Sequence, residues 1–264
     1  MNRLTRRDFI RIAGAAGAGL VALGPSGCKQ GFSRTLARES ALGLRDPKVA
    51  LNGVLVSRGA DPAKITRAAI EAVGGMGKFV KKGATVVIKP NIAFTGKPEN
   101  AVTTNPDVVA ELVRLCRGAS ASKVLVFDRT CNDARRTYKQ SGIEAAAAKA
   151  GAQVKYVTDN DFVEIKIPKG KVLKSWWLNK DILAADTFIN VPIAKHHGST
   201  GLTLGMKNLM GCAGGERGSW HVGHLDQRIA DVTTALKPDL VVLDAFRILK
   251  DHGPTGGSLD DVQQ

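Results

Sequence analysis

Aromatic residues and cysteines are scarce in this chain of 264 residues. Phe, Trp and Tyr make up 5% of the sequence, so a hydrophobic core must consist mainly of Val, Ile, Leu and Ala. The four cysteines are widely spaced, and the lack of a C-x-x-C-x-x-C run excludes an iron–sulfur cluster bound by that motif. Cys116 is expected in the core, whereas Cys131 and Cys212 fall in predicted loops. Each of these two fits a small buried residue, a nucleophile, a metal ligand or half of a disulfide, and we favour the first.

Long apolar runs and dense basic runs are also missing. The apolar run at 12–23 has 12 residues, well short of the ~20 that span a bilayer. The formal net charge of +14 favours anionic partners, such as a phosphorylated or carboxylated small molecule, an anionic membrane surface or nucleic acid. Because the basic residues are spread out and not interleaved with aromatic residues, nucleic acid is not expected.

Residues 1–28 resemble an export signal. The basic segment TRRDFIR at 5–11 precedes the apolar run, and the small residues of GPSGC at 24–28 follow it. The pair Arg6 and Arg7 fits the twin-arginine form S/T-R-R-x-F-L-K closely. This resemblance implies that the twin-arginine export machinery carries the folded protein to the periplasm or to the outer face of the cell membrane.

Cys28 leaves two interpretations open. Ser26 and Gly27 suit the positions before a lipidated cysteine, but Pro25 stands where leucine is usual. The protein is therefore either a lipoprotein anchored to the membrane through Cys28 or an exported protein without that anchor. Residues 29–47 show no convincing period and are predicted to be a tether, so the folded domain is expected over 48–264.

From residue 48 onward, predicted strands alternate with predicted helices. The strands are expected at 48–57, 83–91, 123–128, 152–157, 186–194 and 239–246. The helices are expected at 62–73, 106–116, 142–151, 178–186 and 225–236. Because the strands are apolar throughout, the pattern predicts an α/β fold whose mostly parallel sheet has helices on both faces. Residues 162–178 are predicted to form a small β-hairpin insertion.

Polar side chains stand at the ends of the predicted strands. Parallel sheets bind ligands at the carboxyl ends of their strands, so functional residues are expected there. These positions hold Lys89, Pro90, Asn91, Asp128, Arg129, Lys195, His196, His197 and Asp244. We predict that His196 and Asp128 are the acid–base residues.

The stretch 192–215 combines six glycines, two histidines, two lysines and a cysteine after an apolar strand. It contains neither G-x-G-x-x-G nor G-x-x-x-x-G-K-[ST], so it fits neither nucleotide-binding fingerprint. Its segment LTLGMKNLMG is too apolar for a solvated loop, and GMKN repeats the Lys-Asn pair of IKPN at 88–91. We therefore predict an anion site at the sheet edge. Its ligand-binding residues are predicted to be Lys89, Asn91, Lys195, Gly205, Lys207 and Asn208.

Four histidines lie in two loops that could converge. They are His196, His197, His221 and His224. Imidazoles suit zinc, iron or nickel, so a site for a transition metal is one hypothesis, although no HExxH motif supports a specific metal. Acid–base or anion-binding roles for the same imidazoles are equally open.

Several motifs resemble the DUF362 family. They are IKPN, the TNPDVVAELV helix, FINVPIAKHH, TGLTLGMKNLMG, HLDQRIADV and LVVLDA, spread over 48–257. The resemblance implies an unsettled activity linked to redox or cofactor chemistry, but the iron–sulfur module of some members does not carry over. Members usually continue through a further strand, so a truncated C-terminus is expected. The strand end rich in glycine and lysine is also similar to lactate racemase catalytic domains at the level of fold type.

Two functions follow from these observations. In the first, the exported protein binds an anionic small molecule, with or without a metal, at the carboxyl edge of the sheet. As an enzyme, it would then carry out proton transfer or redox chemistry on an organic acid. In the second, the protein is a non-enzymatic, envelope-tethered binding or accessory factor for a redox system.

Overall fold

The computed structural model describes residues 53–256 and 258–264. The predicted export signal, Cys28, the tether and the first half of the strand predicted at 48–57 lie outside the described residues. The second half, at 53–57, is not a strand, so that part of the prediction is wrong. Its side chains Val54, Leu55 and Val56 are 47–65% exposed, and strand propensity alone does not form a strand without a neighbour to pair with. Within the described residues, no helix is long and apolar enough to cross a membrane.

Five parallel strands form the main sheet, in the order β3-β2-β1-β6-β9. They are β1 (Thr85–Pro90), β2 (Lys123–Val126), β3 (Gln153–Val154), β6 (Thr187–Val191) and β9 (Leu240–Val241). The predicted α/β class with a mostly parallel sheet is thus confirmed. The chain builds outward from β1 to β3 and then continues on the other side of β1. The crevice where such sheets bind ligands therefore lies between the carboxyl ends of β1 and β6.

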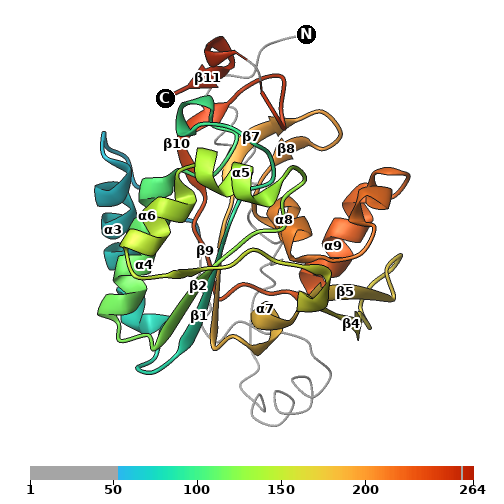
Figure 1. Cartoon of the computed structure of the whole chain (residues 1–264), viewed down its shortest axis with the longest axis horizontal. Helices are drawn as coiled ribbons and strands as arrows, with labels where there is room; N and C mark the ends of the chain where they lie inside the picture. Colours follow the sequence, from blue (N-terminus) through green and yellow to red (C-terminus); the bar gives the residue numbers. More distant parts are fainter. Residues whose placement is uncertain (1–52, 257) are drawn as a thin grey trace, which may run out of the picture.

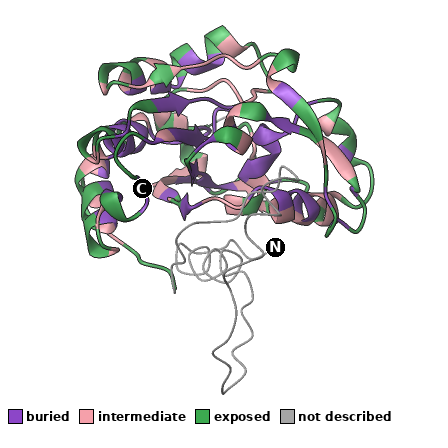
Figure 2. Cartoon of the chain, turned by 90° about the horizontal axis from the view of Figure 1, so that it is seen from below, coloured by how far each residue is buried: buried purple, intermediate pink, exposed green. Residues whose placement is uncertain are grey.

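Helices cover both faces of the main sheet (Figure 1). Successive strand residues point to opposite faces, so Val86 and Ile88 pack on one side while Val87 packs on the other. The first side is covered by α3 (Pro62–Ala72), α4 (Pro106–Gly118) and α6 (Ile143–Lys149). The second is covered by α7 (Lys180–Ala184) and α9 (Leu225–Ala235). Figure 2 shows the buried strands between these two helical layers.

Two neighbouring strands of the main sheet continue into a second sheet beyond its carboxyl edge (Figure 1). The run predicted as one strand at 186–194 is divided at Pro192, which cannot donate a ladder hydrogen bond, into β6 and β7 (Ile193–His197). The run predicted at 239–246 is likewise divided into β9 and β10 (Asp244–Leu249). The order of the second sheet is β11-β10-β7-β8. It is completed by β8 (Gly201–Thr203) and β11 (Val262–Gln263), each antiparallel to its neighbour.

The predicted hairpin insertion is confirmed as the antiparallel pair β4 (Phe162–Lys166) and β5 (Ser175–Asn179). Helix α5 (Ala134–Gln140) was not predicted, because its sequence ARRTYKQ has no apolar period and buries only Thr137 and Tyr138. Helix α8 (Gly205–Asn208) occupies the GMKN segment. Short 3-10 helices occupy Met76–Lys78, Pro98–Asn100, Asp159–Asp161, Leu209–Cys212, Arg217–His221 and Leu259–Asp261.

Candidate functional site

A pocket of about 310 Å³ opens between the carboxyl edge of the main sheet and the second sheet. This volume is at the small end of the roughly 300–1,000 Å³ typical of ligand pockets. We call it the edge pocket. Its lining residues include Asn91, Phe94, Asp128, Arg129, Cys131, Lys195, His197, Thr203, Lys207, Asn208, Met210, Gly211, Arg217, His221 and Pro254. Most of the predicted site residues therefore meet at one place.

A larger hollow of about 920 Å³ is lined by residues of the segments 95–100 and 132–140, together with Leu259. Its charged lining residues are Lys97, Glu99, Asp133 and Arg136, two of each sign. It therefore offers no net charge to an anion and contains none of the predicted site residues. The edge pocket fits the sequence predictions better.

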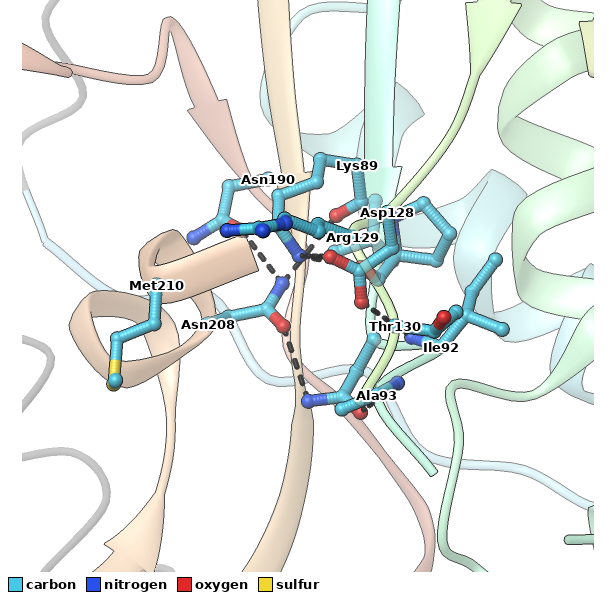
Figure 3. A network of polar contacts seen from close by, with 12 residues as sticks. Lys89, Ile92, Ala93, Asp128, Arg129, Thr130, Asn190, Asn208 and Met210 are labelled. Atoms are coloured by element: carbon cyan, nitrogen blue, oxygen red, sulfur yellow. Dashed lines mark hydrogen bonds and ion pairs between the residues drawn. The ribbon is translucent and has the colours of Figure 1, made fainter. Parts of the chain in front are cut away.

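Lys89 and Asp128 form a buried ion pair beneath the edge pocket. Nζ of Lys89 lies 2.7 Å from Oδ1 of Asp128, and the two side chains are 0% and 2% exposed. Nζ of Lys89 also donates to the carbonyl of Pro90 at 2.8 Å, and Oδ2 of Asp128 accepts from the N–H of Ile92 at 2.7 Å. Figure 3 shows the two charged ends directed toward each other. Each of the two charged groups is thus engaged by a buried partner, and the anion-binding role of Lys89 and the acid–base role of Asp128 stay predictions.

Gly211 lets the main chain reach this ion pair. A β-carbon at this position would collide with the carboxylate of Asp128 and with the end of the Lys89 side chain. The carbonyl of Gly211 also accepts from the N–H of Arg129 at 3.3 Å, which holds the segment against the loop that follows β2. Here glycine is needed for close packing.

Three asparagines join the carboxyl ends of β1 and β6 to α8. Nδ2 of Asn208 donates to Oδ1 of Asn190 at 2.8 Å (Figure 3). Oδ1 of Asn208 accepts from Nδ2 of Asn91 at 3.1 Å. Nδ2 of Asn190 donates to the carbonyl of Gly205 at 2.9 Å. Asn91, Asn208 and Gly205 thus hold α8 across the crevice, and this structural role accounts for them without the predicted ligand. No role was predicted for Asn190 from the sequence, although a single asparagine inside the apolar strand TFINV indicates a polar partner at that position.

Lys195 is buried without a carboxylate partner among the described residues. Its Nζ donates to the carbonyls of Val102 at 2.5 Å and Pro254 at 2.9 Å and lies 5.4 Å from the ring centroid of Phe94. Burial and the nearby charge of Lys207 lower the pKa of Lys195 to about 7. The pocket therefore contains a lysine that can lose its proton near neutral pH.

Of the two lysines that line the edge pocket, Lys207 has the weaker hydrogen-bond partner. Its Nζ donates to Sδ of Met210 at 3.1 Å, and a thioether is a weak acceptor. No oxygen partner for this Nζ is present within the described part of the chain. Burial and the nearby Arg217 lower the pKa of Lys207 to about 8, against the opposing effect of Cys131.

Thr203 on β8 adds an unsatisfied hydroxyl to the pocket. The residue is 3% exposed, and its Oγ1 has no hydrogen-bond partner among residues 53–256 and 258–264. Buried polar atoms in folded proteins normally have a hydrogen-bond partner, either in the protein or in an ordered water. Lys207 and Thr203 thus leave one ammonium group and one hydroxyl group available to a ligand.

The histidines divide into two groups. Nδ1 of His197 accepts from the N–H groups of Ser199 at 3.1 Å and Thr200 at 3.3 Å, so the neutral ring carries its proton on Nε2. Burial and Lys207 lower the pKa of His197 to about 4. Its ring stacks on that of His221 with centroids 6.1 Å apart. His197 and His221 thus lie in the wall of the edge pocket.

The other two histidines lie elsewhere. His196 points away from Lys195 and His197 because side chains alternate along β7, and its Nδ1 accepts from the N–H of Gly253 at 3.0 Å. His224 is exposed where α9 begins. The predicted catalytic role of His196 does not fit this position.

The predicted metal site does not fit the geometry either. No group of three or more His, Cys, Asp or Glu in the described chain is arranged to hold a metal ion. Metal binding through Nε2 of His197 would also move its proton to Nδ1, which already accepts two N–H groups.

The three cysteines in the described residues are free. Cys116 and Cys212 are buried, and burial raises the pKa of each thiol to about 12. Cys131 is exposed, so the favoured prediction of a small buried residue is wrong for Cys131 and confirmed for Cys212. The disulfide considered between these two cysteines is absent, because both thiols are free. Arg217 was not predicted as a site residue. Its guanidinium donates to the carbonyls of Met210 at 2.7 Å and Arg129 at 2.6 Å.

Comparison with known proteins identifies the family. The chain is 29% identical over 213 residues to the thylakoid-associated protein sll1697 of Synechocystis sp., covering 74% of this chain and 62% of that relative. It thus spans less than two thirds of the relative's length. The lactate racemase apoprotein of Thermoanaerobacterium thermosaccharolyticum matches over 64% of this chain and 43% of its own, with 14% identity and a TM-score of 0.37, which supports no conclusion about activity. The model of the family described as a domain of unknown function, DUF362, matches residues 86–263, and the chain belongs to this family.

Proposed function

We propose that this protein binds a small organic anion in the edge pocket. Lys207 is the principal ligand of the anion, and Lys195 adds a second positive charge. Thr203 and the Nε2–H of His197 provide uncharged hydrogen-bond partners. The observation that carries the proposal is the 3.1 Å contact with the thioether of Met210, which is the one hydrogen bond of the Lys207 ammonium to the described residues.

The charge balance of the pocket supports an anion. Burying an ammonium without an anionic partner is unfavourable, and the lowered pKa values of Lys195 and Lys207 express that cost. The charge of Asp128 raises the pKa of Lys195 in part, but Asp128 is paired with Lys89, and the pKa of Lys195 stays lowered. A bound carboxylate or phosphate would offset the cost through charge-assisted hydrogen bonds. The amines and the neutral imidazole are also groups that can exchange protons with a bound acid.

Isothermal titration calorimetry with malonate, oxalate and inorganic phosphate tests the proposal on the full chain. We expect at least one of these probes to bind, and Lys207→Gln to weaken it by about tenfold or more, the effect of one charge-assisted hydrogen bond. Lys123→Gln is the matched control, because Lys123 is exposed at the opposite, amino end of β2. Binding that is unchanged in Lys207→Gln, or absent for all three probes, would contradict the proposal.

We also propose that the protein is exported through its twin-arginine-like segment at 5–11 and functions at a membrane. The name of the relative sll1697 describes a thylakoid-associated protein, which supports a membrane-associated location. Cell fractionation of the Arg6→Lys, Arg7→Lys double variant should show the protein retained in the cytoplasm. In Cys28→Ser, release from the membrane fraction would support the lipid anchor. Normal export of the double variant would exclude the twin-arginine route.

A further inference from the structure

Cys131 lies at the rim of the edge pocket in a fixed position. Its main-chain N–H donates to the carbonyl of Ala93 at 2.7 Å, which ties the loop after β2 to the loop after β1. Its Sγ is 3.6 Å from Nη2 of Arg217, which donates to it. The guanidinium is itself held by the carbonyls of Met210 and Arg129. Both the cysteine and the cation beside its sulfur are therefore positioned by the fold.

The surroundings of Cys131 differ from those of the other described cysteines. Cys116 and Cys212 are enclosed, and the raised pKa of each keeps it a thiol at neutral pH. Cys131 is exposed and has a guanidinium beside its sulfur. The thiolate is the nucleophilic form of cysteine, and reactive cysteines in proteins are typically accessible and lie beside a cation.

Two other polar groups of the same pocket could bind a ligand. Oγ1 of Thr203 is buried and has no partner in the described chain, and the Lys207 ammonium has only the Met210 sulfur. Cys131 and Lys207 both line the edge pocket, and negative charge on Cys131 raises the pKa of that lysine. An anion bound at Lys207 would therefore share the pocket with the sulfur of Cys131.

We infer that Cys131 is a nucleophile of the edge pocket and that it reacts with electrophiles that carry a carboxylate group. This inference rests on the proposed function, because Lys207 must bind the carboxylate. With a 2-halocarboxylate, the thiolate sulfur forms a bond to the α-carbon while the carbon–halogen bond breaks. The halide leaves with the bonding electron pair, and the carboxylate remains bound at Lys207.

Iodoacetate and iodoacetamide test this inference, because they share the reacting carbon and the leaving group but differ in charge. The rate of alkylation at Cys131 is measured for each reagent by peptide mass spectrometry on the full chain, with N-acetylcysteine as the free-thiol reference. We expect the iodoacetate-to-iodoacetamide rate ratio at Cys131 to exceed the reference ratio by about tenfold, as one charge-assisted contact predicts. Lys207→Gln should return the ratio to the reference, and Lys123→Gln should leave it high.

A ratio at Cys131 equal to that of the free thiol, or no alkylation of Cys131, would overturn the inference. Calorimetry with malonate on Cys131→Ser separates this failure from failure of the anion site. If malonate still binds while Cys131 shows no preference for iodoacetate, the nucleophilic role of Cys131 is refuted and the anion site is retained. If neither malonate binding nor the preference is observed, both proposals fail.

Discussion

The ammonium of Lys207 lies 3.1 Å from the sulfur of Met210, and no oxygen in the described part of the chain shares that ammonium. Lys89, one layer deeper, has a carboxylate at 2.7 Å. Two lysines of one site thus differ in whether the protein itself provides the counter-charge. The deeper ammonium is neutralised by Asp128, whereas we propose that the upper ammonium is neutralised by a bound anion.

Replacement of Lys207 should separate stability from binding. In Lys207→Met, the half-buried charge is removed and the apolar stem is kept, so we expect the free energy of unfolding to rise by about 1 kcal/mol. Anion binding should be lost in the same variant. Urea denaturation followed by circular dichroism, together with malonate calorimetry, measures the two effects. A variant that is less stable than the parent would show that Lys207 has a structural partner.

Anion binding should be coupled to proton uptake. The pKa values of Lys195, about 7, and Lys207, about 8, both lie below their ordinary value in the free protein, and a bound anion favours the protonated amines. Affinity should therefore fall as the pH rises from 7 to 9. Calorimetry at pH 8 in Tris and in HEPES, whose ionisation enthalpies differ, would reveal the protons taken up. Equal binding enthalpies in the two buffers would contradict the coupling.

The same two lysines should make the free protein more stable as the pH rises, which is opposite to the pH dependence of anion binding. Their folded-state pKa values lie below the unfolded value of about 10.4, so between those values the unfolded chain binds more protons. Their contribution to stability is complete above the unfolded pKa and is lost as the pH falls toward 7. The melting-temperature difference between the parent and Lys207→Gln should therefore shrink as the pH is raised from 7 to 10. A difference that is constant with pH would exclude this titration.

Gly211→Ala should be strongly destabilising, because the new methyl group collides with the buried Lys89–Asp128 pair. We expect a loss of about 2–4 kcal/mol in the free energy of unfolding, as for an overpacked core position. Gly77→Ala is a suitable control, because a β-carbon there meets open space. Comparable stability of the two alanine variants in urea denaturation would refute the close approach.

The ion pair itself should behave as a unit. Asp128→Ala leaves the Lys89 ammonium buried without its carboxylate, and such changes cost about 3–5 kcal/mol. The double variant Lys89→Met, Asp128→Leu removes both charges and should recover much of that loss. A double-mutant cycle made of Lys89→Met, Asp128→Leu and the double variant measures the coupling in the free energy of unfolding. Additive effects of the two single substitutions would show that the pair contributes no coupling energy.

Local sequence patterns determined the class of the fold and the edge at which the site lies. The apolar runs at 83–91 and 123–128 predicted β1 and β2, and parallel strands necessarily bring their carboxyl ends to one edge. That geometry placed Lys195 and His197 at the same edge as Asn91 and Asp128 before any contact was known. Lys207 was predicted separately, from the GMKN part of the apolar segment LTLGMKNLMG. Local patterns failed at 53–57, where no partner strand accompanies the propensity, and at α5, where the helix has no apolar period.

Only the tertiary structure decided which polar side chains remain available to a ligand. Asn91 is engaged by Asn208, 117 residues later in the chain, and Lys89 is engaged by Asp128. Lys207 differs from these because no carboxylate or amide oxygen of the described residues reaches it. A lysine or asparagine at a strand end looks the same in sequence whether its partner is the protein or a ligand. The difference arises from packing between distant segments, which local periodicity does not encode.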